Sequence, residues 1–284
     1  MIWTGPEVDG ERLAVGDRVI ADGFLTGPRS LGPYQQYGGF ASYAVAPAKA
    51  LLPLPDTFSF DQGSNLLGNY ETAYHCLIAR GKLQKGETVL IHGASGSTGL
   101  AAVHIAKLVG AKVIATGRAP EKLEQVRQQG ADHVVDSSLS FRGTVKELTG
   151  GRGVDVVYDG VGGAISLESL RCVAFGARFL IVGWASTPFV ARGKGQRGAP
   201  NANMLPTNLM MMKGLDVLGC PTAISTHISP SIRVERLQQL MRWVKAGQLK
   251  PHVARVYPLS EVAKALKAKW ESKFVGGCVV HPRE

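Results

Sequence analysis

Three glycines stand at a fixed spacing in VLIHGASGSTGL, residues 89–100. Gly93, Gly96 and Gly99 follow an apolar run typical of a buried strand and lead directly into a helical pattern. Glycine permits a tight turn and a close approach of the main chain to a phosphate, and a helix N-terminus offers that phosphate unpaired N–H groups. The pattern predicts a turn that binds a dinucleotide, with a spacing one residue longer than the commonest fingerprint. Further donors in this turn are the hydroxyls of Ser95, Ser97 and Thr98.

The next apolar run ends in ATGRAPEK, residues 115–122, and this end indicates which dinucleotide is bound. A site for NAD presents Asp or Glu to the ribose hydroxyls at this place, and a carboxylate there would repel a 2′-phosphate. Gly117 instead leaves room for the phosphate, and Arg118 can bind it through paired charge-assisted hydrogen bonds. Lys122 supplies a second cation one helical turn later. The segment predicts NADP(H); the alternative is that Arg118 is a surface residue at a helix start.

The elements around these residues follow a repeated strand–turn–helix pattern. Short β-branched runs, apolar on both faces, predict buried parallel strands at 88–92, 111–116, 132–136, 154–159, 177–183 and 215–220. Helical patterns between them, several ending at the glycine that often stops a helix, cover 99–110, 119–130, 141–150, 164–176 and 205–214. Six strands joined by helices predict a doubly wound, six-stranded parallel sheet of the Rossmann type. This context favours a dinucleotide site over a tight turn without a ligand.

The flanking segments have a different pattern. Residues 13–60 contain short apolar runs and several prolines, which suggest antiparallel strands joined by turns. Residues 230–284 contain two amphipathic helical patterns and a final strand. The two chain ends therefore predict one second domain into which the sheet domain is inserted. The predicted boundaries are 1–72 and 223–284 for this second domain and 73–222 for the dinucleotide-binding domain.

Charge and hydropathy narrow the possible partners. The net charge of +10 suits an anionic ligand and also nucleic acid. The basic residues are spread along the chain, and the densest group, 191–200, contains no interleaved aromatic residue, so we expect a solvated loop there and no nucleic-acid partner. No run of eighteen apolar residues occurs, which argues against a membrane partner.

Metal-binding and disulfide patterns are absent from the sequence. The four cysteines, Cys76, Cys172, Cys220 and Cys278, are isolated from one another, and the seven histidines are dispersed. Neither a zinc ribbon nor a disulfide framework is indicated. The sequence predicts reduced thiols in a cytoplasmic protein without a metal.

With these residues placed, the chain resembles the zinc-independent quinone oxidoreductase branch of the medium-chain dehydrogenase/reductase superfamily. The resemblance is carried by GGFASYAVAPAKALLPLPDTFSFDQGSNLLGNYETAYHCL, by LQKGETVLIHGASGSTGLAAVHIAKLVGAKVIATG, and by GRGVDVVYDGVGG and GARFLIVGWAS, in family order. It implies a dinucleotide-binding domain inserted into a GroES-like barrel. It also implies hydride transfer from NADPH to quinones, enones or related α,β-unsaturated carbonyl compounds, by a protein that is usually a homodimer.

The resemblance assigns roles to particular residues. Thr72, in NYETAY, matches a position that touches the nicotinamide ring, and Gly183 and Trp184 match contacts to the nicotinamide half of the cofactor. Cys220 and Pro221 follow the sixth strand at a similar place. Gly68 stands where zinc-dependent relatives carry a zinc-binding cysteine, which implies a reaction without metal. Near Ser137 relatives often carry Tyr or His against the adenosine, so this contact is not expected here.

Several features of the sequence leave alternatives open. Met1 falls where relatives are already partway through their barrel, which predicts either a shortened gene model or a protein with a partial barrel. A partial barrel would favour a catalytically impaired protein that still binds NADP(H), and RNA binding is a further alternative that the charge permits. The catalytic proton donor is not assigned: Tyr70 could serve, or it could be packed in the core. The loop at 185–204 could cover the substrate, whose identity within the quinone and enone class stays open.

Overall fold

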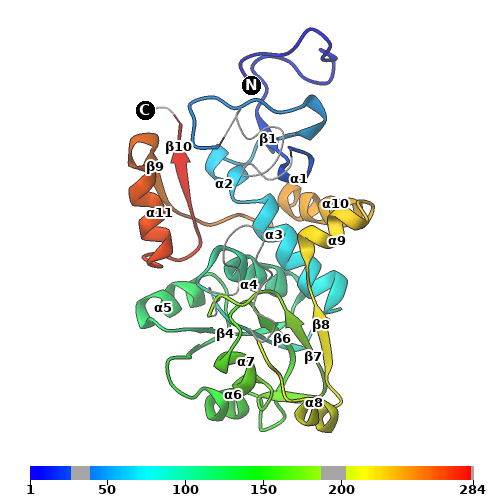
Figure 1. Cartoon of the computed structure of the whole chain (residues 1–284), viewed down its shortest axis with the longest axis vertical. Helices are drawn as coiled ribbons and strands as arrows, with labels where there is room; N and C mark the ends of the chain where they lie inside the picture. Colours follow the sequence, from blue (N-terminus) through cyan, green and yellow to red (C-terminus); the bar gives the residue numbers. More distant parts are fainter. Residues whose placement is uncertain (27–38, 187–202, 283–284) are drawn as a thin grey trace. The chain divides into compact units, whose positions relative to one another are not determined.

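The structure is a computed structural model that describes residues 1–26, 39–186 and 203–282 (Figure 1). The chain forms two compact units: one is Asn69–Thr222, and the other combines Met1–Gly68 with Ala223–Glu284. The predicted basic loop at 191–200 and most of the 185–204 loop lie outside the described residues.

The unit Asn69–Thr222 is built on a six-stranded parallel sheet. Its strands are β3 (Thr88–Ile91), β4 (Lys112–Gly117), β5 (His133–Asp136), β6 (Val154–Asp159), β7 (Val173–Ile181) and β8 (Asp216–Gly219). Their spatial order is β5-β4-β3-β6-β7-β8, and all five pairings are parallel. The predicted doubly wound sheet is therefore confirmed. The order reverses between β3 and β6, where open parallel sheets bind their ligands at the carboxyl ends of the strands.

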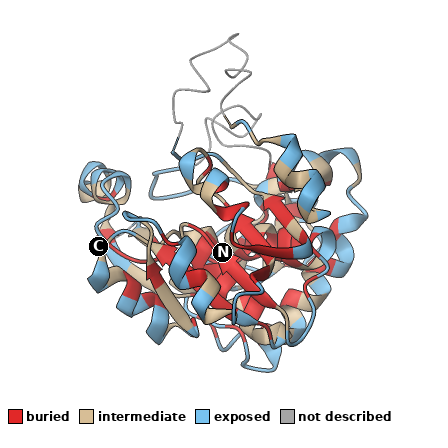
Figure 2. Cartoon of the chain, turned by 90° about the horizontal axis from the view of Figure 1, so that it is seen from below, coloured by how far each residue is buried: buried red, intermediate tan, exposed pale blue. Residues whose placement is uncertain are grey.

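Helices connect these strands on both faces of the sheet. They are α4 (Ser97–Val109), α5 (Pro120–Gln128), α6 (Arg142–Leu148), α7 (Ala164–Ser169) and α8 (Thr207–Lys213). Side chains of α6, α7 and α8 pack with one face of the sheet in a single apolar cluster that includes Leu90, Val157 and Phe179. In Figure 1, α4 and α5 lie on the other side of the strands. Every residue of β3 is buried, and Figure 2 shows buried positions gathered in the strands.

Glycine ends two of these helices as predicted. Gly110 follows α4 with a φ of 86°, and Gly214 follows α8 with a φ of 54°. A residue with a Cβ rarely adopts this left-handed conformation, so glycine stops the helix at little cost. The predicted helix at 164–176 is too long, because Val173–Gly176 belong to β7. A short apolar run fits a helix or a strand equally well by its pattern, and here pairing with β6 decides for the strand.

An irregular helical segment precedes the sheet. Helix α3 (Leu67–Tyr74) continues as a π-helical segment, η3 (His75–Arg80), which nothing in the sequence pattern indicated. Adding a Cβ to Gly81 would place it 2.9 Å from a side-chain carbon of Leu180, so η3 ends in close contact with β7. Such π-helical turns are rare and frequently lie at functional sites.

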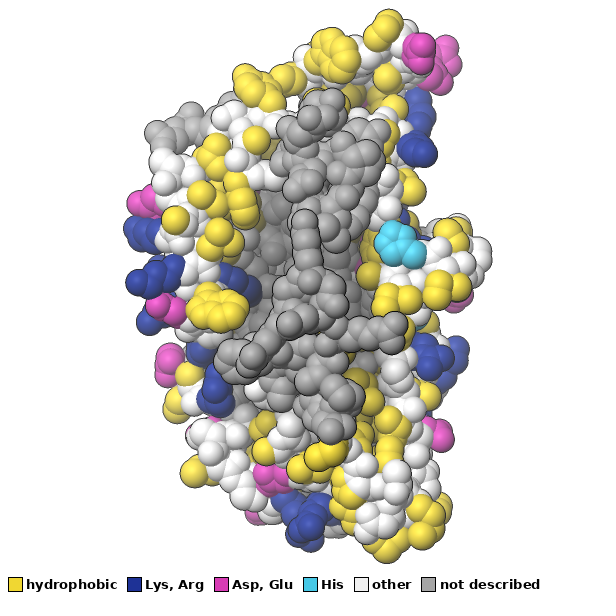
Figure 3. Space-filling view, in the orientation of Figure 1, with side chains coloured by type: hydrophobic (Ala, Val, Ile, Leu, Met, Phe, Trp, Pro, Cys, Tyr) yellow, Lys and Arg dark blue, Asp and Glu magenta, His cyan; other side chains and the backbone are white. Residues whose placement is uncertain are grey.

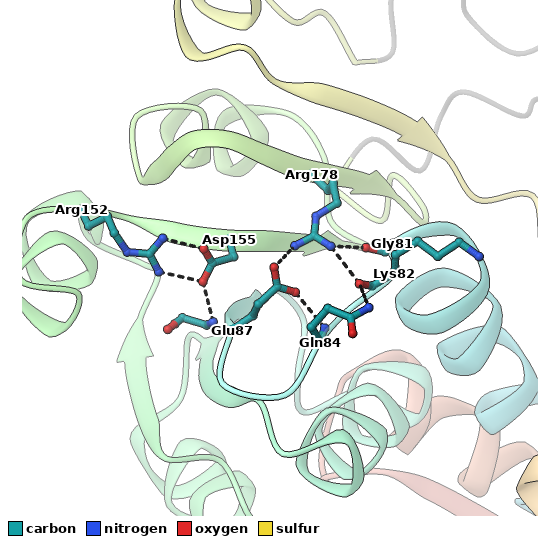
Figure 4. A network of polar contacts seen from close by, with 8 residues as sticks. Gly81, Lys82, Gln84, Glu87, Arg152, Asp155 and Arg178 are labelled. Atoms are coloured by element: carbon teal, nitrogen blue, oxygen red, sulfur yellow. Dashed lines mark hydrogen bonds and ion pairs between the residues drawn. The ribbon is translucent and has the colours of Figure 1, made fainter.

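A polar network fixes the loop between η3 and β3 (Figure 4). Arg178, on β7, donates hydrogen bonds to the carbonyl oxygens of Gly81 and Lys82 at 2.8 and 3.0 Å and forms an ion pair with Glu87. Asp155, on β6, accepts a 2.8 Å hydrogen bond from the backbone N–H of Thr88. The network therefore positions the first residue of β3.

The other unit contains short strands and helices from both chain ends. From the first end come β1 (Val19–Ala21), α1 (Gly23–Thr26), η2 (Ala48–Ala50), β2 (Leu51–Pro53) and α2 (Phe60–Ser64). From the second come α9 (Thr222–Ile228), α10 (Ile232–Lys245), β9 (Val253–Pro258), η5 (Leu259–Glu261), α11 (Val262–Trp270) and β10 (Gly277–His281). The two predicted amphipathic helices are α10 and α11. Among the described residues β1 pairs antiparallel with β2, and β9 pairs parallel with β10.

A buried ion pair joins the two chain ends within this unit. Arg233, on α10, pairs with Asp22, which directly follows β1, and both side chains are buried. The guanidinium also lies 4.5 Å from the centroid of the Phe24 ring. At the surface, His281 on β10 lies 2.7 Å from the carboxylate of Asp61. Segments from the first and last quarters of the chain thus form one unit.

Replacing Arg178 with alanine should destabilise the protein, because three acceptors around a half-buried guanidinium lose their donor. We expect a loss of about 2–3 kcal/mol in the free energy of unfolding. The matched control is Arg152→Ala, since Arg152 pairs with Asp155 at the surface and should contribute less than about 1 kcal/mol. Urea unfolding followed by circular dichroism measures both, and equal losses would contradict the assignment.

Candidate functional site

The glycine turn between β3 and α4 is held by contacts that admit no side chain. Gly93 has a φ of +65°, in the left-handed region that favours glycine. A Cβ on Gly99 would lie 2.8 Å from the carbonyl carbon of Gly93 and 2.9 Å from the Cα of Ala94. Any residue other than glycine at position 99 would therefore push the first turn of α4 away from the strand end.

The N-terminus of α4 meets this turn without a side-chain cap. Gly96 is the N-cap residue, and its N–H donates to the Gly93 carbonyl at 2.9 Å. The first-turn amides of a helix have no partners within the helix, and with the helix dipole they suit an anion such as a phosphate. The three predicted hydroxyl residues of the turn are half-buried. Thr98 Oγ1 donates to Asn69 Oδ1 at 3.3 Å.

A buried histidine supports the turn from behind. His92 lies 2.8 Å from Thr116 Oγ1 through Nδ1 and 2.7 Å from Ser169 Oγ through Nε2. Ser169 donates its own proton to the Ile165 carbonyl at 2.7 Å, so Nε2 of His92 is the donor and Nδ1 is the acceptor. Burial lowers the pKa of His92 to about 4, although the charge of Asp159 acts to raise it. His92 is thus a neutral link between three elements, and the sequence pattern did not single it out.

A buried carboxylate shapes the loop after β6. Asp159 Oδ1 accepts hydrogen bonds from the backbone N–H groups of Val161 and Gly162 at 2.8 and 2.9 Å, and Oδ2 accepts one from the Ser166 hydroxyl. This Asp was also missed in the sequence, where it stands as one of several acidic residues at strand ends. Its carboxylate serves as an acceptor for the loop and is fully buried, so it is not available to a ligand.

The predicted nicotinamide residues that follow β7, Gly183 and Trp184, lie against that loop. A Cβ on Gly183 would be 3.3 Å from the Gly160 carbonyl oxygen, and one on Gly162 would be 3.2 Å from the Cα of Trp184. Ala185 N–H donates to the Gly160 carbonyl at 3.2 Å. The backbones of the loops after β6 and β7 are therefore in direct contact. The Trp184 side chain remains 50% exposed.

Arg118 directly follows the end of β4. Gly117 is the last residue of β4, and its carbonyl accepts hydrogen bonds from the N–H and hydroxyl of Ser137 at 2.8 and 3.1 Å. Arg118 is exposed and forms no hydrogen bond or ion pair with any residue in the described ranges. Lys122 is half-buried in the first turn of α5. The guanidinium of Arg118 is therefore available to an anion at this strand end.

Beside β4, strand β5 ends in Asp136, whose carboxylate already accepts two hydrogen bonds through one oxygen. Asp136 pairs in register with Gly117. Its Oδ1 accepts hydrogen bonds from the N–H and hydroxyl of Ser138 at 2.8 and 2.7 Å. The backbone hydrogen bond from Ser138, with that of its hydroxyl, lowers the pKa of Asp136. Asp136 is a fixed negative charge at the end of β5, one strand away from Arg118. Strand β4 itself ends without an acidic residue.

Tyr70 is packed and hydrogen-bonded within the Asn69–Thr222 unit. Its hydroxyl lies 2.7 Å from His104 Nδ1, and the two rings stack with centroids 5.9 Å apart. His104 Nε2 faces Gln129 Oε1 at 3.1 Å; since that oxygen only accepts, Nδ1 accepts the Tyr70 proton. Of the two alternatives for Tyr70, the packed residue agrees with these contacts. Thr72, two residues further along α3, is half-buried.

The described ranges contain no candidate metal site and no candidate membrane span. Over residues 1–26, 39–186 and 203–282, no three His, Cys, Asp or Glu side chains come together in a group that could hold a metal ion. In the same residues no helix has the length and apolar character needed to cross a bilayer.

Comparison with known proteins relates the chain to a group of oxidoreductases. Residues 97–244 match the family described as zinc-binding dehydrogenase. The chain is 32% identical over 283 residues to a quinone oxidoreductase-like protein 2 homolog of Nematostella vectensis, covering 99% of this chain and 73% of the relative. It is 32% identical over 266 residues to the quinone oxidoreductase of Homo sapiens, covering 92% of this chain and 74% of the relative.

A solved mycobacterial structure, complexed with NADPH, is similar over nearly the whole chain. The TM-score is 0.75 at 26% identity, with 98% of this chain and 79% of the other chain covered. The mycobacterial protein and this chain therefore share a fold in both units.

Lowering the pH should lower the free energy of unfolding, because His92 is buried in its neutral form. A pKa of about 4 in the folded protein lies below the ordinary 6.5, so the unfolded chain binds the proton more tightly, and stability present above pH 6.5 is lost as the pH falls toward 4. This group alone should lower the free energy of unfolding by about 2 kcal/mol between pH 8 and pH 5. Urea unfolding of His92→Gln should lack that part of the pH dependence. The control His133→Gln, on β5, should keep it; a full pH dependence in His92→Gln would contradict the neutral role.

Proposed function

This chain belongs to the quinone oxidoreductase branch of the medium-chain dehydrogenase/reductase superfamily, and we propose that it is an NADPH-dependent reductase. The proposed substrates are quinones or α,β-unsaturated carbonyl compounds, reduced without a metal ion. The observation that carries the proposal is the meeting of an uncapped helix N-terminus with a glycine turn that tolerates no side chain.

The chain's own residues fit NADP(H). Main-chain N–H groups at Ser97 and Thr98, in the first turn of α4, would hold the diphosphate, because Gly99 lets this turn start directly beside Gly93. Arg118, which has no partner within the described ranges, would bind the ribose 2′-phosphate, with Lys122 as a second cation. The absence of an acidic residue on β4 at this place supports NADP(H) over NAD(H).

The nicotinamide end of the site is proposed from the loops after β6 and β7. Gly183 and Trp184 would contact that half of the cofactor, because their backbone lies at the carboxyl edge of the sheet beside Gly160. Thr72, on α3, is proposed as a further contact. Bound NADPH would supply a hydride to the substrate. The loops would orient the ring and exclude water, so rate acceleration would come mainly from positioning.

The proton donor is not assigned to a side chain in this proposal. Tyr70 is held by His104 at 2.7 Å, so releasing its proton to a substrate would first break that hydrogen bond. Metal independence is proposed from the donor set, because Gly68 offers no ligand atom and no group of metal-binding side chains occurs in the described ranges. A domain resembling GroES is proposed for Met1–Gly68 with Ala223–Glu284.

We further propose that the protein forms a homodimer. Its proposed location is a reducing compartment such as the cytoplasm. Strand β8 is an edge of the sheet, and α8, which precedes it in the sequence, exposes Met211 and Met212. A sheet edge that pairs with no further described strand, together with exposed apolar side chains on the preceding helix, is typical of a surface that binds a second chain. Nucleic acid is not proposed as a partner: on the face drawn in Figure 3, basic side chains are scattered, with acidic ones among them.

A direct spectrophotometric assay tests the proposed activity. The purified chain should oxidise NADPH in the presence of a panel of quinones and enones, with a slower rate for NADH, as followed by absorbance of the reduced nicotinamide. NADPH fluorescence measured in the same samples reports binding separately. Binding without oxidation of NADPH by any panel member would contradict the reductase and favour a nucleotide-binding protein without turnover.

Replacing Arg118 with alanine should weaken NADPH far more than NADH. Hydrogen bonds to charged groups contribute about 1.5–3 kcal/mol, so the dissociation constant for NADPH should rise about 10- to 100-fold, while that for NADH stays nearly constant. Fluorescence titration with both nucleotides measures the change. The matched control is Arg127→Ala on α5, since Arg127 pairs with Glu124 at the surface. Equal losses for NADPH and NADH in Arg118→Ala would refute the role.

A further inference from the structure

Two consecutive residues of α3 bind side chains of α4. Asn69 Oδ1 accepts a hydrogen bond from Thr98 Oγ1 at 3.3 Å, and the Tyr70 hydroxyl lies 2.7 Å from His104 Nδ1. The rings of Tyr70 and His104 also stack, with their planes 27° apart. All four residues belong to the Asn69–Thr222 unit. Within this unit, α3 is therefore tied to α4 at two points.

A third helix sets which nitrogen of His104 carries the proton. His104 Nε2 lies 3.1 Å from Gln129 Oε1. Gln129 is the C-cap residue of α5, and its N–H donates to the Gln125 carbonyl at 3.0 Å. Because an amide oxygen only accepts, the proton of the neutral ring is on Nε2 and the lone pair is on Nδ1. Gln129 thus makes His104 the acceptor for the Tyr70 hydroxyl.

Burial makes the Tyr70–His104 hydrogen bond important for the position of α3. Tyr70 is 3% exposed, and a hydroxyl buried this deeply depends on partners within the protein. The π-helical segment η3, which continues α3, also contacts α4, and its first three residues are buried. The hydrogen bond therefore selects one position of α3 along α4.

Both helices carry residues of the proposed cofactor site. Ser97 and Thr98, in the first turn of α4, are proposed to hold the diphosphate. Thr72, two residues after Tyr70 on α3, is proposed to contact the nicotinamide half. The spacing between these two parts of the site is set by the way α3 lies on α4. Hydride transfer is sensitive to small displacements of the reacting groups, so this spacing matters for the reaction.

We propose that His104 is a positioning residue for the cofactor site: through Tyr70 it holds α3 on α4 in the position that places Thr72 at the nicotinamide half. The inference rests on the proposed NADPH site. His104 acts through Tyr70 and does not itself bind the cofactor. Loss of the Tyr70–His104 hydrogen bond should therefore weaken contacts to the nicotinamide half and leave the adenosine half bound by Arg118 and the first turn of α4.

Two ligands separate these halves in titration calorimetry of the full chain. NADPH contains both halves, whereas adenosine 2′,5′-bisphosphate carries the 2′-phosphate and a 5′-phosphate without nicotinamide. Tyr70→Phe removes the hydroxyl and keeps the ring. It should raise the dissociation constant for NADPH about 3- to 10-fold and leave that for the bisphosphate unchanged. The matched control is Tyr257→Phe, since Tyr257 is a buried tyrosine on β9; both dissociation constants should stay constant.

The pattern of losses distinguishes positioning from a general effect on the fold. Equal losses for NADPH and the bisphosphate in Tyr70→Phe would overturn the proposal, and so would an unchanged affinity for NADPH. A wild type that binds neither ligand would contradict the proposed function itself. Circular dichroism reports whether Tyr70→Phe keeps its fold. Gln129→Met is a second variant that retains both Tyr70 and His104, and it should also weaken NADPH selectively.

Nuclear magnetic resonance of the full chain, with histidine labelled with nitrogen-15 and no nucleotide added, tests the tautomer directly. The His104 signals, assigned by their loss in His104→Leu, should show a neutral ring with its proton on Nε2. Gln129→Met should move part of that proton to Nδ1, whereas Gln129→Glu, which keeps an acceptor oxygen, should leave it on Nε2. A wild-type ring protonated on Nδ1 alone would overturn the proposal. This readout depends on neither NADPH binding nor reductase activity.

Discussion

The carbonyl group of Gly93 occupies the space that a side chain at position 99 would need. Because position 99 has no side chain, the first turn of α4 lies directly against the end of β3. A Cβ added at Gly99 would be only 2.8 Å from the Gly93 carbonyl carbon. The positive end of the helix dipole and the first-turn amides are thereby brought to the point where the strand order reverses. Any side chain at position 99 would move the helix, and the proposed phosphate site would lose its geometry even if the sheet were unchanged.

Buried polar groups keep the loops around this contact in one arrangement. His92 joins β3 to β4 and α7, and Asp159 joins β6 to the loop that follows it. Both are held by two or more hydrogen bonds, which offsets the cost of burying them. Arg118, by contrast, is exposed and carries a charge that no described residue neutralises. Rigid, neutral or internally satisfied groups thus surround the turn, while an available cation stands at the neighbouring strand end.

The sheet could be predicted from the sequence because its strands are buried on both faces and read as continuous β-branched runs. Glycines such as Gly110 and Gly214 marked helix ends through their backbone conformation. The extent of β7 could not be predicted, since only its pairing with β6 separates strand from helix. His92 and Asp159 were missed for a related reason. Each depends on neighbours brought together by the fold, and no local spacing encodes them.

Titration calorimetry of the full chain with NADPH, for the wild type and for Gly99→Ala, tests the central claim most directly. The wild type should give saturable heat with a dissociation constant in the micromolar range or below, equivalent to about 8 kcal/mol or more. Gly99→Ala should retain its circular dichroism spectrum and give little or no heat. Absence of heat in the wild type, or equal affinity in the folded variant, would contradict the account.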